Sequence, residues 1–230
     1  MTQALARAVR QHAAIAFEPP LPSAGRGTSE EIIAKGEITP VFQPIIALSD
    51  RGVHGFEALS RLAPGSPLAN PEELFQQAVR FGLTSQLELL CRKKALARAH
   101  ELALPGRLFL NVCPSLLLAR DHEKGATAAF LEEIGLVRSA ITFELTERTL
   151  IEDYGLFKRI ISHYRDQGYS IAIDDLGSGY AGLKMLAELE PEYVKLSSFL
   201  IRDIDRFPTK QALVEALLTF CVRIGAKVIA

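Results

Sequence analysis

Residues 171–182 read IAIDDLGSGYAG, an apolar run that ends on two adjacent aspartates and continues into a loop containing glycines. This pattern predicts a buried strand over residues 170–173 and a helix over residues 183–189. In α/β proteins, ligands and catalytic groups collect at the carboxyl ends of strands, which is where Asp174 and Asp175 fall. Carboxylate oxygens are the ligands that hard divalent cations prefer. The stretch therefore predicts a metal site.

Strands and helices alternate on both sides of this stretch. Further strands are expected at residues 40–48, 52–59, 108–112, 141–145, 193–196 and 227–230. Gly135, Gly168 and Gly225 each precede one of the strands, as is typical where a helix ends. This alternation predicts right-handed βαβ units and a parallel sheet. The turn at residues 49–52 predicts an antiparallel hairpin for the first two strands.

Two helix starts are marked by capping residues. Ser29 precedes two glutamates, and Asn70 precedes Pro71, so helices are expected to begin at both places. The second is expected to be followed by a longer helix over residues 85–102. Prolines and glycines between Glu18 and Thr28 indicate a linker. We therefore predict an N-terminal extension and linker over residues 1–28 and one domain over residues 29–230.

The bulk composition excludes several classes of protein. The chain has 230 residues, of which 48% are hydrophobic and 23% charged, and its net charge is -1. That composition is typical of a globular domain, and the charge gives no reason to expect DNA binding. Cys91, Cys113 and Cys221 form no disulfide or metal motif, which favours a reduced, cytoplasmic protein. No apolar run is long enough for a membrane span, and the start of the chain does not resemble a secretory signal.

Five of the expected strands carry one strongly polar residue on the face opposite their aliphatic side chains. These residues are Glu57, Asn111, Glu144, Asp174 and Lys195. Because side chains alternate between the helix layer and the interior of a barrel, the five are expected to converge inside it. Several buried carboxylates repel one another unless they are paired or bind a cation. The pattern predicts a divalent metal site at the mouth of a barrel, with Lys195 beside it.

Each of these residues also has a simpler explanation. Either aspartate of the pair could cap the following helix, and Asn111 could be a turn residue. Glu144 and Glu147 could form a solvated edge, and Lys195 could pair with a surface carboxylate. The five histidines show no ligand spacing and are expected to be structural or exposed. The shared position at strand ends favours the metal site over these separate explanations.

Six short motifs follow one another along the chain. They are QPI at 43–45, FEALSR at 56–61, NVCP at 111–114, ELTE at 144–147, DDLGSGY at 174–180 and VKL at 194–196. In this order they resemble the EAL domain family, bacterial phosphodiesterases that act on the second messenger cyclic di-GMP, and the resemblance covers residues 31–230. It implies an α/β fold, a modified TIM-type (β/α) barrel with an antiparallel first strand. The implied activity is hydrolysis of cyclic di-GMP to linear pGpG.

The resemblance also implies a role for individual residues. By similarity, one Mg²⁺ or Mn²⁺ ion would be bound by Glu57, Asn111, Glu144 and Asp174, and a second by Asp174 and Asp175. Lys195 would position the attacking water, so the implied catalytic group is Glu57, Asp174, Asp175 and Lys195. Gln43 and Arg61 would contact the nucleotide, since a guanidinium fits a phosphate well. Glu147, Gly177 and Gly179 would support the loop at residues 174–180, which in this family also takes part in forming a homodimer.

The sequence departs from the family at several positions. Ser60, Cys113 and Leu176 replace Leu, Ser and Phe, and Ser197 stands where an aspartate is usual. The resemblance further implies a metal-binding Glu, and the last strands and helices, beyond Ala230. The barrel is therefore expected to be incomplete at its C-terminal end, and this chain to be slow or inactive.

Two alternatives to an enzyme remain, a receptor that binds cyclic di-GMP without cleaving it and a protein-interaction module. A regulatory or sensor domain is expected outside this chain, because the first 28 residues are too short to form one.

Overall fold

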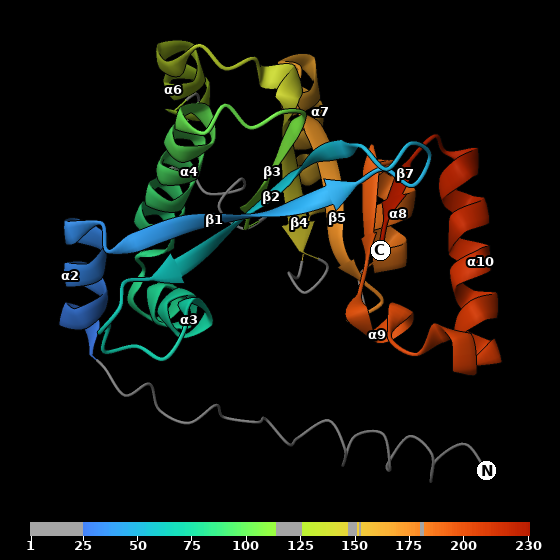
Figure 1. The fold of residues 1–230 in the computed structure, drawn as a ribbon, viewed down its shortest axis with the longest axis horizontal. Helices are drawn as coiled ribbons and strands as arrows, with labels where there is room; N and C mark the ends of the chain where they lie inside the picture. The colour runs from blue at the N-terminus through green and yellow to red at the C-terminus, as the bar shows by residue number, and fades with distance from the viewer. Residues whose placement is uncertain (1–24, 114–125, 147–150, 152, 180–181) are drawn as a thin grey trace, which may run out of the picture.

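A curled sheet of seven strands forms the centre of the protein (Figure 1). The computed structural model describes residues 25–113, 126–146, 151, 153–179 and 182–230. The strands lie side by side in chain order, and they are β1 (Ile38–Ile46), β2 (Val53–Leu62), β3 (Arg107–Val112), β4 (Ile141–Thr146), β5 (Ser170–Leu176), β6 (Tyr193–Leu196) and β7 (Lys227–Ile229). β1 and β2 are antiparallel, and all the later neighbours are parallel. The predicted TIM-type α/β arrangement with an antiparallel first strand is confirmed, and the described strands leave β1 and β7 as the two edges of the sheet.

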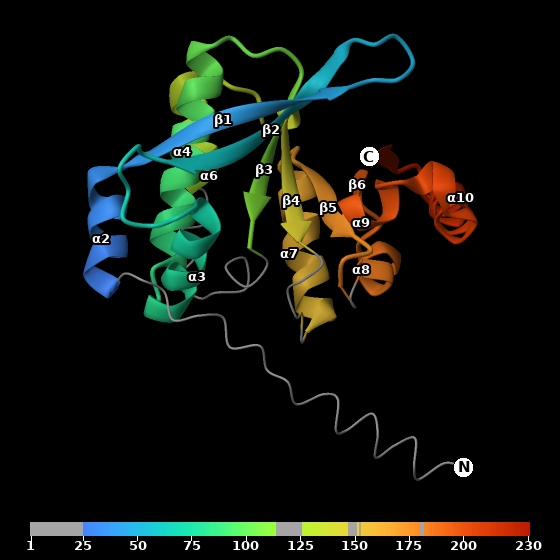
Figure 2. The same ribbon diagram turned by 60° about the horizontal axis from the view of Figure 1, so that its bottom comes forward.

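Helices cover the outer face of this sheet (Figure 2). The described helices are α2 (Arg26–Lys35), α3 (Pro71–Phe81), α4 (Thr84–Glu101), α6 (Ala126–Ile134), α7 (Tyr154–Asp166), α8 (Gly182–Leu189), α9 (Ser198–Ile201) and α10 (Pro208–Arg223), with short 3₁₀ turns η1 (Arg138–Ala140) and η2 (Ile204–Arg206). The main core lies between the strands and α4, α6, α7, α8 and α10. A smaller core joins α2, α3 and the start of α4 to β1. Within the described part of the chain, no helix is long and apolar enough to cross a bilayer.

The helix ends test the predicted caps. Asn70 Oδ1 accepts a hydrogen bond of 2.9 Å from the backbone N–H of Glu73, and Pro71 is the first residue of α3, as predicted. The prediction that Ser29 caps a helix is wrong, because α2 already begins at Arg26. Ser29 is instead fully buried, and its hydroxyl donates to Gln77 Oε1 at 2.6 Å. A serine before glutamates therefore ties α2 to α3 here.

The cap of α3 gives a direct stability prediction. We expect Asn70→Ala to lower the free energy of unfolding by about 1 kcal/mol, because the N–H of Glu73 loses its acceptor. Urea unfolding followed by circular dichroism measures the change. Ser85→Ala, an exposed substitution in the first turn of α4, is the matched control. Equal midpoints for the two variants would contradict the assigned cap.

The inward face of the sheet is arranged in three levels. The upper level, at the carboxyl ends of the parallel strands, contains Glu57, Asn111, Glu144, Asp174 and Lys195. The middle level is an apolar cluster of Phe109, Ala172 and Tyr193, with Ile45 and Ile229 packed against it. The lower level contains Arg107, Thr142, Ser170 and Lys227. Polar groups therefore occupy both ends of the interior, and an apolar layer separates them.

Candidate metal centre and adjoining cavity

Three carboxylates from three different strands surround one ammonium group. Lys195 Nζ lies 2.8 Å from Glu57 Oε2, 2.8 Å from Glu144 Oε1 and 2.9 Å from Asp174 Oδ1. One oxygen of each carboxylate lies within 4.8 Å of the others. The prediction that these four residues converge is therefore confirmed in their geometry. Pairing with a surface carboxylate, the simpler explanation for Lys195, is wrong, since only 12% of its side chain is exposed.

The strand register explains why these side chains meet. Asn111 on β3 is the Cα partner of Glu144 on β4, and Gln43 on β1 is the partner of Glu57 on β2. Along β5 the pairing with β6 is interrupted between Ile173 and Leu176. Such a bulge re-aims the side chains of a strand. Asp174 is thereby placed against Lys195 at the end of β5.

Burial dominates the electrostatics of this centre. Glu144 is fully buried, and this burial raises its pKa to about 8, with Glu57 and Asp174 adding to the rise and Lys195 opposing it. For Lys195, burial disfavours the charged form, but the three carboxylates outweigh that effect and raise its pKa. Lys195 is therefore a permanent cation at neutral pH, whereas Glu144 retains a proton more readily than an ordinary glutamate. Three carboxylates facing one ammonium leave the cluster with excess negative charge.

The Glu144 pKa predicts a pH dependence of stability for the metal-free protein. The group ionises near pH 4.5 in the unfolded chain and near 8 in the folded one, so its contribution is fully present below pH 4.5 and is lost as the pH rises toward 8. Between pH 5 and 8 we expect the free energy of unfolding of the wild type to fall relative to that of Glu144→Gln. The slope of this fall against pH should correspond to at most about one bound proton. Urea unfolding in EDTA across this range measures the difference. Parallel pH profiles for the two proteins would contradict it.

The donor set fits a divalent cation. Among the described residues Glu144 Oε2 has no hydrogen-bond partner, although it is buried. An oxygen-only set of carboxylates, with the amide of Asn111 on the neighbouring strand, matches the preference of Mg²⁺ and Mn²⁺. A bound cation would also offset the excess negative charge of the cluster.

Other residues predicted from the sequence lie around this cluster rather than in it. Asp175 adopts φ 61 in the bulge, and its carboxylate is not among the three that converge. Gln43 and Asn111 are exposed side chains. Arg61 is exposed too, and its Nη1 donates to the Ser60 carbonyl at 2.8 Å.

Of the residues predicted to support the loop at residues 174–180, Gly177 and Gly179 lie in the described part of the chain. Gly177 has φ 96, and a side chain there would collide with Leu200, 2.7 Å from the added carbon. The close approach therefore requires glycine at this position. Gly179 is exposed at the end of the described part of the loop. Glu147 and Tyr180 lie outside the described residues.

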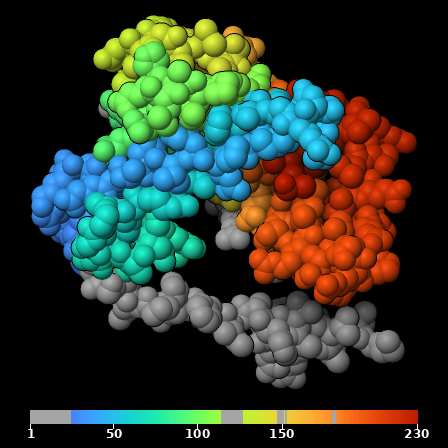
Figure 3. All heavy atoms as spheres, viewed as in Figure 1, coloured from blue at the N-terminus to red at the C-terminus, as the bar shows by residue number. Residues whose placement is uncertain are grey.

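A cavity of about 730 Å³ adjoins the centre at the ends of β2 and β3. Its walls combine apolar side chains, including Pro40, Ala58 and Phe75, with Arg61 and Asn111. A volume of this size accommodates a ligand as large as a nucleotide. Figure 3 shows a hollow between the segments around α3 and those around α9. The residues that line the cavity include Pro71 and Phe75 of α3 and none of α9. Asn111 lines the cavity and is also the strand partner of Glu144, so the cavity lies next to the carboxylate cluster.

Two residues of the cavity wall were not singled out from the sequence. Glu88 and Arg92 lie one turn apart on α4, with only 6% and 8% of their surfaces exposed. Glu88 Oε1 accepts a 2.9 Å hydrogen bond from the backbone N–H of Cys113, which fixes the end of β3 just after Asn111. Burial raises the pKa of Glu88 to about 7, although Arg92 and that N–H oppose the rise. A Glu–Arg pair spaced i, i+4 between Leu87 and Leu96 is the signal that the sequence offered.

The sequence matches the EAL domain family over residues 27–230. It is 29% identical over 191 residues to the blue light- and temperature-regulated antirepressor BluF of Escherichia coli, a match that covers 81% of this chain and 46% of BluF. It is 29% identical over 194 residues to the cyclic di-GMP phosphodiesterase NbdA of Pseudomonas aeruginosa, covering 82% of this chain and 25% of NbdA.

A solved structure shows the same architecture. The manganese/cy-diGMP complex of BlrP1 from Klebsiella pneumoniae aligns with a TM-score of 0.75 at 29% identity, over 90% of this chain and 50% of that one. The chain spans half or less of the length of each of these relatives. Fold and sequence motifs agree across most of its residues. The chain therefore belongs to the EAL domain family.

Proposed function

We propose that this chain is a metal-dependent phosphodiesterase domain that hydrolyses cyclic di-GMP to linear pGpG. The observation that carries the proposal is the cluster of Glu57, Glu144 and Asp174 around Lys195, beside a cavity of nucleotide size. The cyclic di-GMP phosphodiesterase NbdA is 29% identical, and the solved BlrP1 complex contains both manganese and the cyclic dinucleotide. These relatives support the choice of substrate and metal.

Glu57, Glu144, Asp174 and Asn111 would hold the first Mg²⁺ or Mn²⁺ ion, and Asp175 with Asp174 would serve a second. Such an ion supplies Lewis-acid stabilisation of the phosphodiester charge and makes water a stronger nucleophile. The chain supplies the rest. Carboxylates from three parallel strands give the site a fixed geometry without a mobile loop.

Lys195 and Arg61 act on the substrate in this proposal. Lys195 remains protonated, so its ammonium can orient the attacking water and stabilise charge on the phosphate oxygens. Arg61, at the rim of the cavity, offers a planar donor pair that matches a phosphate. Water attacks phosphorus, the bond to the ribose 3′-oxygen breaks, and that oxygen takes a proton. The product is a linear dinucleotide that carries the 5′-phosphate.

Calorimetry followed by product analysis tests this function. We expect cyclic di-GMP to bind in Ca²⁺, whose looser geometry suits binding more than catalysis, and to be converted to pGpG when Mn²⁺ or Mg²⁺ replaces it. Chromatography with protein in excess over nucleotide detects even slow turnover. Binding without conversion would leave the receptor function, and the absence of binding in either metal would contradict both.

A receptor function is the second candidate, and Ser197 favours it. Ser197 is 2% exposed, and its hydroxyl has no hydrogen-bond partner among the described residues. It stands two residues beyond Lys195 and close to Gly177, where an aspartate would add a carboxylate to the outer part of the site. The relative BluF is named as an antirepressor. A weakened outer shell is consistent with nucleotide binding that is coupled to a protein partner instead of to turnover.

A further inference from the structure

The lower level of the barrel interior holds positive charge without a matching carboxylate. Arg107 Nη1 donates to Ser170 Oγ at 3.1 Å and to Thr142 Oγ1 at 3.3 Å. Among the described residues, neither Arg107 nor Lys227 forms an ion pair, and no partner is found for the remaining N–H groups of Arg107. A half-buried guanidinium that is held by hydroxyls alone keeps donors available for a ligand.

The basic groups of this level lie around the side chain of Tyr193. The guanidinium carbon of Arg107 lies 5.6 Å from the centre of its ring, and Lys227 Nζ lies 5.9 Å from the same centre. His54 Nε2 lies 3.1 Å from the Tyr193 hydroxyl. Burial lowers the pKa of His54, and Lys227 and Arg107 lower it further. Arg107, Lys227 and His54, which come from three different strands, therefore each lie beside Tyr193.

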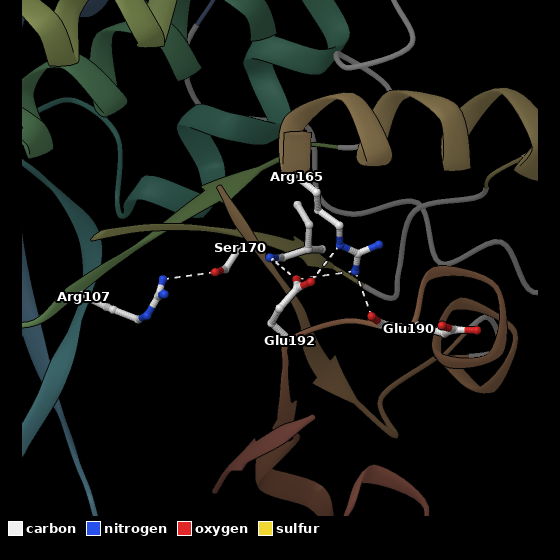
Figure 4. A network of polar contacts seen from close by, with 6 residues as sticks. Arg107, Arg165, Ser170, Glu190 and Glu192 are labelled. Atoms are coloured by element: carbon white, nitrogen blue, oxygen red, sulfur yellow. Dashed lines mark hydrogen bonds and ion pairs between the residues drawn. The ribbon is translucent and has the colours of Figure 1, made fainter. Parts of the chain in front are cut away.

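Glu192, the acidic residue next to Tyr193 in the chain, forms its contacts with other groups. Glu192 Oε1 accepts from Arg165 Nε at 2.8 Å, and Oε2 accepts from the Ile171 N–H at 2.8 Å. Figure 4 shows that the carboxylate of Glu192 points toward Arg165, while Arg107 lies on the other side of Ser170. Glu192 therefore does not neutralise Arg107.

The two ends of the barrel interior have opposite character. The carboxylate cluster lies at the carboxyl ends of the strands, and the basic level lies at their amino ends. Between them Phe109 and Tyr193 stack edge to face, with ring centres 5.1 Å apart, and Ala172 fills the remaining space. Phe109 is fully buried, so this layer separates the two polar levels. An anion bound at the lower level would not occupy the metal centre.

We propose that Arg107, Lys227 and His54, with the hydroxyls of Ser170 and Tyr193, form a binding site for a phosphate-sized oxyanion at the amino-terminal end of the barrel. An Arg fork and an ammonium are the groups that recognise phosphate oxygens, and hydroxyls complete such a site by donating. Lys227 is an exposed side chain, so its ammonium is accessible to a dissolved anion. The phosphate can be inorganic or the terminal phosphate of a nucleotide. The proposal does not depend on the phosphodiesterase activity.

His54 is a built-in reporter for this site. We expect phosphate to raise its NMR-determined pKa, because a bound anion offsets the two neighbouring cations that lower it. The titration is carried out in EDTA with the whole chain, and the His54 signal is assigned by its loss in His54→Gln. Half-saturation is expected below about 5 mM phosphate. Sodium chloride at the same ionic strength is the control, and an equal shift in chloride would show screening alone and overturn the site.

Two substitutions and one control locate the anion. We expect Lys227→Met and Arg107→Gln each to weaken phosphate binding at least about tenfold. Lys184→Met is the matched control, since Lys184 also lies over a tyrosine ring, 4.0 Å from the centre of Tyr154, but has no role in the basic level. If Arg107→Gln does not fold, the exposed Lys227 decides the question. Wild-type phosphate affinity in Lys227→Met would overturn the proposal.

The source of the phosphate is settled by three ligands. Titrations with inorganic phosphate, GMP and guanosine are compared in EDTA. Saturable binding of inorganic phosphate that is lost in Lys227→Met supports the site and identifies a free phosphate as its ligand. Saturable binding of GMP alone, again lost in Lys227→Met, supports the site and identifies an esterified phosphate. Binding of guanosine as tight as that of GMP would show recognition of the base and overturn the proposal.

Discussion

Glu144→Gln is expected to abolish tight Mn²⁺ binding and to reduce hydrolysis of cyclic di-GMP by at least about 100-fold. Loss of a residue that hydrogen-bonds a metal ligand typically lowers metal affinity or activity 10- to 100-fold. Loss of a buried ligand itself should therefore lower them at least as much. Glu144 is fully buried and contributes one of the three carboxylates that surround Lys195 in the described part of the chain. The substitution conserves the shape of the side chain, and it removes a carboxyl group whose pKa is raised by burial in the folded protein. The metal-free variant should therefore be at least as stable as the wild type.

Mn²⁺ affinity is measured from the loss of the free-ion signal in electron paramagnetic resonance, and turnover from pGpG formation with protein in excess. Glu192→Gln is the control, because it removes a paired carboxylate outside the carboxylate cluster. We expect that control to keep its metal affinity. Equal Mn²⁺ affinity in Glu144→Gln and the wild type would show that the carboxylate cluster is not the metal centre.

Lys195→Met is expected to separate catalysis from metal binding. Without the ammonium, hydrolysis should fall by about 10²- to 10³-fold, the size typical for removal of one preorganised donor. Mn²⁺ binding should persist or tighten, because the cation no longer shares the three carboxylates with Lys195 Nζ, which lies 2.8–2.9 Å from each. The same two assays measure both quantities. Lys184→Met, which removes a lysine away from the centre, should change neither.

A parallel loss of metal binding and hydrolysis in Lys195→Met would contradict the separate roles. It would mean that Lys195 holds the carboxylates in place and takes no part beyond that. Full hydrolysis in the variant would remove Lys195 from the mechanism altogether.

Much of this architecture follows from local patterns in the sequence. Strict alternation along Ile141–Thr146 places Thr142 and Glu144 on one face and three large apolar residues on the other, as the structure has them. The glycines that were expected to end helices, Gly135, Gly168 and Gly225, all have positive φ, which a helix end of this type requires. Local chemistry dictates these features, so the sequence alone is sufficient to predict them.

The features that the sequence did not predict depend on contacts between distant segments. Asp174 and Asp175 are adjacent, yet only Asp174 reaches Lys195, because the bulge in β5 and the φ of 61 at Asp175 arise where β5 meets β6. Ser29 has the composition of a cap and becomes a buried donor to Gln77, 48 residues away. In the sequence Glu88 has the features of an ordinary helical glutamate, but in the structure it accepts a hydrogen bond from the backbone N–H of Cys113, the residue after β3. Pairing across the fold, which no local pattern encodes, decided each of these outcomes.

Anomalous scattering from a Mn²⁺-soaked crystal tests the central claim most directly, because it locates the metal without assuming any activity. We predict a strong peak between the carboxylates of Glu57, Glu144 and Asp174, within bonding distance of all three and beside Asn111. A peak at other acidic residues, or no peak in crystals that contain saturating Mn²⁺, would contradict the assignment of this cluster as the metal centre.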